Sequence, residues 1–484
     1  MATLMSLPAE IRLSIVELLN PDDALRFAAV NKGMWQLCDS LITTHRIMVT
    51  EYRHFYADSD QKTVWKLFND LSDDPRVADY VLVFQMSIVD NAFYDPKVRW
   101  HDPPVVGDWL KPDPLDVAKY IRAADDSFFL ATPAIMEWEP YAGRNLSEIR
   151  TSEDLHKALE DGDTDPMMPL VLTRLHALQT LRLIPCHRAP WFTNALRVIS
   201  AACADPVNNP GLNGLFQHLK TVQLSHWDTE LCIAWESAVF FTRLPSLEYF
   251  SAHMIGGGMH RDEEDDADIP DYWKPALAPT SNLKTLLFSR SMISSEVVNV
   301  ILSNCKALET FEYDAGGASI SWDAEYDPRG FMSAIIQYCA HSIERLVLEN
   351  DDCESIQDLD GSIRAVPCLN QLEKLKVLRC QYHDLVDNVW DDQSTAAFDP
   401  QMLFPRSLER LHLDQVGRYD DELKRPQLMD LLLESKISSF PNLTQVFLAN
   451  ESYTHGNLAA RATEQGLEYA MVKRDEEGLF TADY

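Results

Sequence analysis

An apolar pattern of the form x-x-L-x-x-L-x-L recurs along the chain, and this repetition constrains the fold more than any other feature. In each copy the last apolar positions alternate with other residues, as in a short strand with one buried face. From Leu178 to Leu443 the copies are spaced by about 33 residues on average. The nine copies are Leu178-Leu181-Leu183, Leu219-Val222-Leu224, Leu247-Phe250-Ala252, Leu283-Leu286-Phe288, Leu308-Phe311-Tyr313, Ile343-Leu346-Leu348, Leu372-Leu375-Val377, Leu408-Leu411-Leu413 and Leu443-Val446-Leu448.

Stretches with helical spacing lie between these strands, so the predicted unit is a strand followed by a helix. They are Phe192–Cys203, Ile233–Phe241, Ser295–Leu302, Phe331–Tyr338 and Leu428–Leu433. Stacking such units buries a continuous core and forms a parallel sheet. The sequence therefore predicts an α/β fold, a leucine-rich-repeat-like solenoid or horseshoe, whose spacing exceeds the 20 to 29 residues of regular leucine-rich repeats. A purely helical array is the alternative, but Thr180–Leu183 and Arg345–Leu348 alternate with period two, which favours strands.

Composition limits the classes of function and the cellular location that the protein can have. The 484 residues carry a formal net charge of −33, which excludes nucleic-acid binding by bulk charge and disfavours anionic membranes. We find no amino-terminal leader and no apolar run of the roughly 18 residues that a membrane span needs, so we expect a protein of the cytoplasm or nucleus. Nine cysteines without a C-x-x-C pair fit neither a disulfide framework nor a zinc site and indicate reduced, mostly buried thiols.

The first 48 residues are predicted to form a module of three short helices. Ser6-Leu7-Pro8 opens the first with a serine cap and a proline, and Asn20-Pro21 opens the second. Trp35 lies in the third, after a turn at Asn31-Lys32-Gly33. Helices this short bury little surface and need a partner.

These residues resemble the F-box. The similarity rests on Leu7-Pro8-x-Glu10-Ile11, Ile15, Leu18, Asp23, Leu25, Val30-Asn31-Lys32 and Trp35, in that family's order and spacing. The resemblance implies that the module binds the Skp-type adaptor of a cullin-RING ubiquitin ligase. The residues carried over for adaptor binding are Leu7, Pro8, Ile11, Ile15, Val30 and Trp35. The alternative is a three-helix cap on the repeats.

Two further segments are similar to fungal F-box proteins with carboxy-terminal leucine-rich repeats. They are Ala158-Leu159-Glu160-Asp161-Gly162-Asp163 with the apolar run that follows it, and Phe404-Pro405-Arg406-Ser407-Leu408-Glu409-Arg410-Leu411. The resemblance implies a substrate-receptor subunit that binds the adaptor through the F-box and a target protein through the repeats, with no catalysis of its own. A leucine-rich-repeat protein-interaction scaffold without a ligase role is the alternative function.

The predicted organisation has four parts. Residues 1–48 form the F-box-like module, 49–165 a connector and solenoid cap with a proline-rich loop at Asp90–Pro114, 166–450 the irregular repeats, and 451–484 a carboxy-terminal cap or tail. Within 49–165 we expect a helix over Trp65–Leu71 and a first strand over Val77–Val83. The acidic segment Arg261–Asp268 is predicted to be an exposed loop.

The sequence lacks four common motifs of enzyme active sites and nucleotide-binding sites. There is no P-loop, no H-E-x-x-H, no G-x-S-x-G and no dinucleotide fingerprint, so we predict no catalytic residue, no metal and no cofactor.

A basic column is the candidate substrate site. In the strand pattern, the residues beside the middle apolar position face away from the core, which would stack Arg345, Lys374 and Arg410 on successive strands with Lys376 and His412 beside them. Stacked like charges repel unless they are compensated. Compensation by Glu344, Glu373 and Glu409 is the simpler interpretation, and an acidic or phosphorylated peptide is the alternative ligand.

Overall fold

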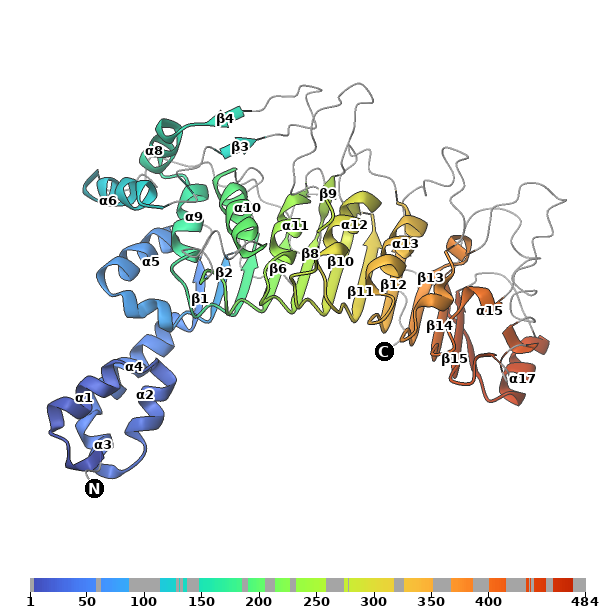
Figure 1. Ribbon diagram of the computed structural model, residues 1–484, viewed down its shortest axis with the longest axis horizontal. Helices are drawn as coiled ribbons and strands as arrows, with labels where there is room; N and C mark the ends of the chain where they lie inside the picture. The colour runs from blue at the N-terminus through green and yellow to red at the C-terminus, as the bar shows by residue number, and fades with distance from the viewer. Residues whose placement is uncertain are drawn as a thin grey trace. The chain divides into compact units, whose positions relative to one another are not determined.

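The structure is a computed structural model (Figure 1). It divides into two compact units, Met1–Gln223 and Leu224–Tyr484, which we take in turn. The residues described are 4–57, 62–86, 114–127, 130, 134–136, 148–184, 190–204, 214–226, 232–257, 274–276, 278–316, 326–350, 367–385, 400–414, 432–434, 436, 439–449 and 456–472.

The first unit begins with a helical module. A short 3₁₀ turn, Leu4–Ser6, precedes α1 (Ala9–Glu17), α2 (Pro21–Ala28), α3 (Lys32–Leu37) and α4 (Asp39–Tyr52). The Asn20 and Asn31 side chains cap α2 and α3 by accepting hydrogen bonds from the backbone N–H groups of Asp23 and Met34. The predicted Ser6 cap is wrong, because α1 starts at Ala9 and Pro8 is its N-cap residue without a side-chain cap bond. The fourth helix, α4, was not predicted.

The rest of the first unit combines short strands with helices. Its strands have the order β1-β2-β5-β6, and β1 pairs in parallel with β2, as β2 does with β5. The elements are β1 (His54–Ala57), α5 (Lys62–Asp73), a 3₁₀ helix (Pro75–Asp79), β2 (Val83–Met86), α6 (Pro114–Asp125), β3 (Ala134–Met136), β4 (Glu148–Arg150), α8 (Ser152–Asp161), α9 (Thr164–Leu172), β5 (Thr180–Leu183), α10 (Pro190–Ala204) and β6 (Thr221–Ser225), which spans the boundary between the units.

Local sequence explains how these helices are placed. A capping box between Thr151 and Asp154 starts α8, and Gly162 ends it in the left-handed conformation that a residue without Cβ adopts freely. In α9 the buried Asp165 accepts hydrogen bonds of 2.9 Å from the backbone N–H groups of Trp191 and Phe192, at the start of α10. This carboxylate therefore fixes α10 against α9.

The second unit repeats a strand and a helix. Its main strands follow the order β8-β10-β11-β12-β13-β14-β15-β16, and each successive pair is parallel. The elements are β7 (Ile233–Ala234), α11 (Glu236–Thr242), β8 (Tyr249–His253), β9 (Ile255–Gly257), β10 (Thr285–Ile293), α12 (Ser295–Ser303), β11 (Thr310–Ala315), α13 (Pro328–Cys339), β12 (Arg345–Asn350), η5 (Leu369–Gln371), β13 (Val377–Gln381), η6 (Tyr382–Leu385), α15 (Pro400–Leu403), β14 (Arg410–Asp414), β15 (Gln445–Ala449), α17 (Gly456–Glu464) and β16 (Glu468–Val472).

A ladder of fully buried side chains forms the core beneath these strands. One residue from each of seven strands occupies the same register position and has no solvent exposure; these residues are Phe250, Leu286, Phe311, Leu346, Leu378, Leu411 and Val446. They are the middle positions of the repeat pattern in every case but one. The predicted α/β class with a parallel sheet is confirmed, and the second unit is compatible with a solenoid.

The exception is the seventh copy. The sequence Leu372-x-x-Leu375-x-x-Leu378 fits the pattern in two registers, and the structure takes the one that lies three residues later. Leu378 pairs with Leu346, and Cys380 fills the next inward position, where it is fully buried. The predicted register, with Leu375 and Val377 inward, is wrong because a buried cysteine can replace the final aliphatic residue.

Other predicted elements have mixed outcomes. The helices over Trp65–Leu71, Phe192–Cys203, Ser295–Leu302 and Phe331–Tyr338 are confirmed. The helix predicted over Ile233–Phe241 starts only at Glu236, because Ile233 lies in β7. The strand predicted over Val77–Val83 is wrong, since Val77–Asp79 belong to a 3₁₀ helix and β2 starts only at Val83. Parallel strands also occur outside 166–450, at β1, β2 and β16. The loop over 261–268, most of Asp90–Pro114 and most of Leu428–Leu433 lie outside the described residues.

Candidate functional site

One face of the sheet carries the polar side chains, and we call it the outer face. It is formed by the residues on either side of each buried middle position, which are half-buried on β8, β10 and β11. From β12 to β14 this face becomes more enclosed, and Val347, Arg379 and His412 are all buried. These three residues occupy one row across adjacent strands.

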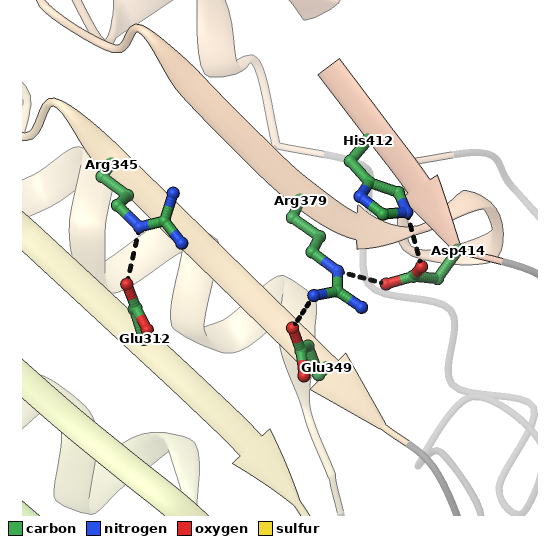
Figure 2. A network of polar contacts seen from close by, with 6 residues as sticks. All are labelled: Glu312, Arg345, Glu349, Arg379, His412 and Asp414. Atoms are coloured by element: carbon green, nitrogen blue, oxygen red, sulfur yellow. Dashed lines mark hydrogen bonds and ion pairs between the residues drawn. The ribbon is translucent and has the colours of Figure 1, made fainter. Parts of the chain in front are cut away.

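Two cations of the second unit, Arg345 and Lys376, are paired with carboxylates of the same chain. Arg345 Nε donates a 2.6 Å hydrogen bond to Glu312 Oε1, from β12 to β11 (Figure 2). Lys376 precedes β13 directly, and its Nζ lies 2.6 Å from Glu344 Oε2. This interaction lowers the pKa of the Glu344 carboxyl group. Internal compensation is therefore the observed state of both side chains.

Arg379 is the centre of a more enclosed network, which we call the Arg379 network and which comprises Glu349, Arg379, His412 and Asp414. Its guanidinium group donates from Nε to Asp414 Oδ2 at 2.8 Å and forms a second ion pair, through Nη1, with Glu349 (Figure 2). His412 Nε2 lies 3.0 Å from Asp414 Oδ1. The planar guanidinium group of Arg379 thus links β13 to carboxylates on both neighbouring strands, β12 and β14.

Electrostatics support a structural role for this network. Burial raises the pKa of Asp414, but the close contact with His412 and the positive charge of Arg379 outweigh it, so the pKa lies below its usual value. The side chains of Arg379 and Asp414 are only 10% and 9% exposed. The charged state of Asp414 is therefore stabilised by groups of this chain, without need of a ligand.

The predicted basic column is not assembled as expected. Arg345 is followed across the sheet by Val377 and then Arg410, so Lys374 does not lie between them. Lys374 is exposed and precedes β13, because that strand starts three residues after the predicted register. Of the five residues, Arg345 and Lys376 are paired with acids of neighbouring repeats, and His412 is buried beside Asp414. The use of these residues in substrate binding stays a prediction.

The helical module presents a second candidate surface. Val16, Ala28, Met34, Cys38 and Ile42 form a buried cluster of its own, against which Trp35 packs as a partly buried residue. Outside that cluster Ile11 is 48% exposed and Val30 68% exposed, Pro8 is exposed, and Leu7 and Ile15 are half-buried. Five of the six residues predicted to bind an adaptor therefore reach the surface, and Trp35 contributes mainly to the core of the module.

Two more apolar side chains of the module are exposed. Leu18 is 87% exposed and Met5 is 45% exposed. Neither was predicted as a site residue, although Leu18 belongs to the F-box-like pattern. The sequence signal that could have identified Leu18 is its position in that pattern, directly after the last residue of α1.

Contacts of the module explain why this surface is open. The extensive contacts of α1, α2 and α3 are with one another and with α4, and α4 in turn contacts β1. Tyr52, the last residue of α4, is buried and donates a 3.0 Å hydrogen bond to Asp70 of α5. Helix α4 thus carries the main packing of the module against the rest of the first unit.

A buried carboxyl group lies beside the Arg379 network. Asp384 is 2% exposed, accepts a hydrogen bond from the backbone N–H of Gln381, and lies near Arg329, Tyr326 and Cys380. Burial raises the pKa of Asp384 to about 8. The group is closed off from solvent, and we assign it to the core.

Searches of the described residues find no group of three or more His, Cys, Asp or Glu side chains placed to hold a metal ion. Within the same residues, no helix combines the length and apolar character needed to cross a bilayer. The seven cysteines of the described segments are free thiols, and five of them are buried. Comparison of the chain with models of protein families and with curated proteins finds no match in either case.

Proposed function

We propose that this protein is a substrate-receptor subunit of an SCF-type cullin-RING ubiquitin ligase. In this proposal, residues 4–52 are an F-box-like module that binds a Skp-type adaptor, and the strand-helix units are irregular leucine-rich repeats that bind a target protein. No catalytic residue of this chain takes part. A ligase of this class would act in the cytoplasm or nucleus.

The observation that carries the proposal is the exposed apolar surface of the module. Ile11, Leu18 and Val30 are solvated although their helices have a buried cluster of their own. Large apolar side chains that stay exposed on a small helical domain with a core of its own are typical of a protein-interaction surface. A module that only capped the repeats would bury such side chains against the neighbouring strands, so the arrangement favours docking over capping.

Purified full-length protein and a Skp-type adaptor should form a stable complex in size-exclusion chromatography. Changing Ile11 and Val30 to Asp should abolish the complex, because charged groups would then replace the apolar contact. Ile47→Asp is the matched control, since this isoleucine is 58% exposed on α4 and lies outside the F-box-like pattern. The proposal is wrong if the intact protein binds no adaptor, and that outcome would favour a scaffold role.

A further inference from the structure

The outer face of the first unit carries a row of side chains that differs from those of the second. Tyr56, Gln85, Arg182 and Gln223 lie on β1, β2, β5 and β6, and the register pairs Tyr56 with Gln85 and Gln85 with Arg182. Arg182 contacts Gln223 directly. We call these four residues the Arg182 row.

Arg182 is the cation of this row, and its partners are amides. Its Nε donates to Gln223 Oε1 at 2.7 Å and its Nη1 to Gln85 Oε1 at 3.5 Å. Among the described residues Arg182 has no carboxylate partner. On the outer face of the second unit, by contrast, Arg345 pairs with Glu312, and Arg379 pairs with both Glu349 and Asp414. In a chain with a net charge of −33, a half-buried guanidinium without an acid is an unbalanced local charge.

The amide partners fix the polarity of the whole row. A guanidinium group can only donate hydrogen bonds, so both glutamines must turn their carbonyl oxygens toward Arg182. Their NH₂ groups are then left for other partners. Together with the remaining N–H groups of Arg182 and the hydroxyl of Tyr56, which is 60% exposed, the row presents hydrogen-bond donors to a ligand. The row therefore suits a ligand group that carries several hydrogen-bond acceptors.

We propose that the Arg182 row binds a peptide segment of the target protein through a carboxylate side chain, Asp or Glu, seated on Arg182. One fixed cation matches one carboxylate charge, and the guanidinium fork fits its two oxygens. A phosphate group carries nearly twice that charge, and phosphate readers usually provide a cluster of arginines. Tyr56, at the end of the row, supplies an aromatic surface for a neighbouring side chain of the peptide.

This inference rests on the proposed function only in naming the peptide as part of a ligase target. Full-length protein is panned against a library of random peptides, and the selected peptides are resynthesised with Glu, Gln or phosphoserine at the acidic position. We expect selection of peptides with an acidic residue, loss of at least about tenfold in affinity on Glu to Gln replacement in the peptide, and weaker binding at high salt.

Variants of the protein then locate the site. Arg182→Gln should weaken binding at least about tenfold, because the charge that pairs with the peptide is removed. Arg76→Gln is the matched control and should leave peptide binding unchanged, since this arginine of the same unit lies outside the Arg182 row and already pairs with Asp74. Failure to select any peptide, equal binding by Arg182→Gln, or a preference for phosphoserine would each overturn the inference.

Adaptor binding is measured on the same samples. If peptide binding depends on Arg182 while the adaptor does not bind, only the ligase proposal fails. If the adaptor binds and the peptides do not, only the peptide site fails.

Discussion

Removal of the Arg379 charge should destabilise the second unit far more than removal of the Arg345 charge. In Arg379→Met the stem of the side chain is largely kept, but Glu349 and the buried Asp414 lose their cation. Breaking a buried ion pair by removing one partner costs about 3–5 kcal/mol. Arg345 and Glu312 are 30% and 35% exposed, so Arg345→Met should cost no more than about 1 kcal/mol.

Urea unfolding followed by circular dichroism measures this difference as a shift in midpoint at constant slope. A second variant, Arg379→Met combined with Asp414→Asn, should recover part of the loss, because the uncompensated buried charge is removed with its partner. Equal losses for Arg379→Met and Arg345→Met, or no recovery in the double variant, would show that the network contributes no more than an exposed ion pair.

Three further predictions concern a buried carboxyl group, a tightly packed glycine and the cysteines. The folded state raises the pKa of Asp384 to about 8, so folding takes up a proton at any pH between the unfolded pKa and 8. The stability of the wild-type protein should therefore fall as the pH rises from the unfolded pKa toward 8. In urea titrations, Asp384→Asn should gain stability relative to the wild type between pH 4 and pH 8. A Cβ at Gly256 would lie 2.8 Å from Cys232 Sγ, so Gly256→Ala should cost about 1–3 kcal/mol, and much less in a Cys232→Ala background; additive losses would exclude this clash. Among the described cysteines, iodoacetamide should label Cys368 in the native protein and spare the five buried thiols, as checked by peptide mass mapping; rapid labelling of the buried thiols would contradict their burial.

The repeat pattern predicted most of the second unit because its middle apolar position is almost invariably a buried strand residue. The pattern misplaced β13, where leucines at two positions and a cysteine at a third allowed a shift of three residues. It also missed β1 and β2, where Tyr52 and Val81 occupy the first template position, which is leucine or isoleucine in all nine detected copies. Short strands of this kind acquire their register from parallel pairing with a neighbour, which periodicity along the chain does not encode.

Sequence reasoning expected each stacked cation to be compensated by the glutamate immediately before it, and for Arg345 the structure shows a different acid. It assigned the glutamates immediately before each cation, and of these only Glu344 is paired with a predicted site residue, Lys376. Arg345 instead uses Glu312, which lies on the preceding strand. Long side chains reach diagonally across a sheet, so the partner of a charged residue depends on the register of two strands at once. The Arg182 row was missed for the same reason, since Gln85 lies on a strand that the pattern did not detect.

The central claim is that the exposed surface of α1–α3 is the docking site of a Skp-type adaptor. Hydrogen exchange of the full-length protein, measured with and without the adaptor, tests it most directly. We expect slower exchange in residues 5–37 when the adaptor is present, and unchanged exchange in the strands of both units. Protection confined to the strands, or no protection anywhere in the chain, would contradict it.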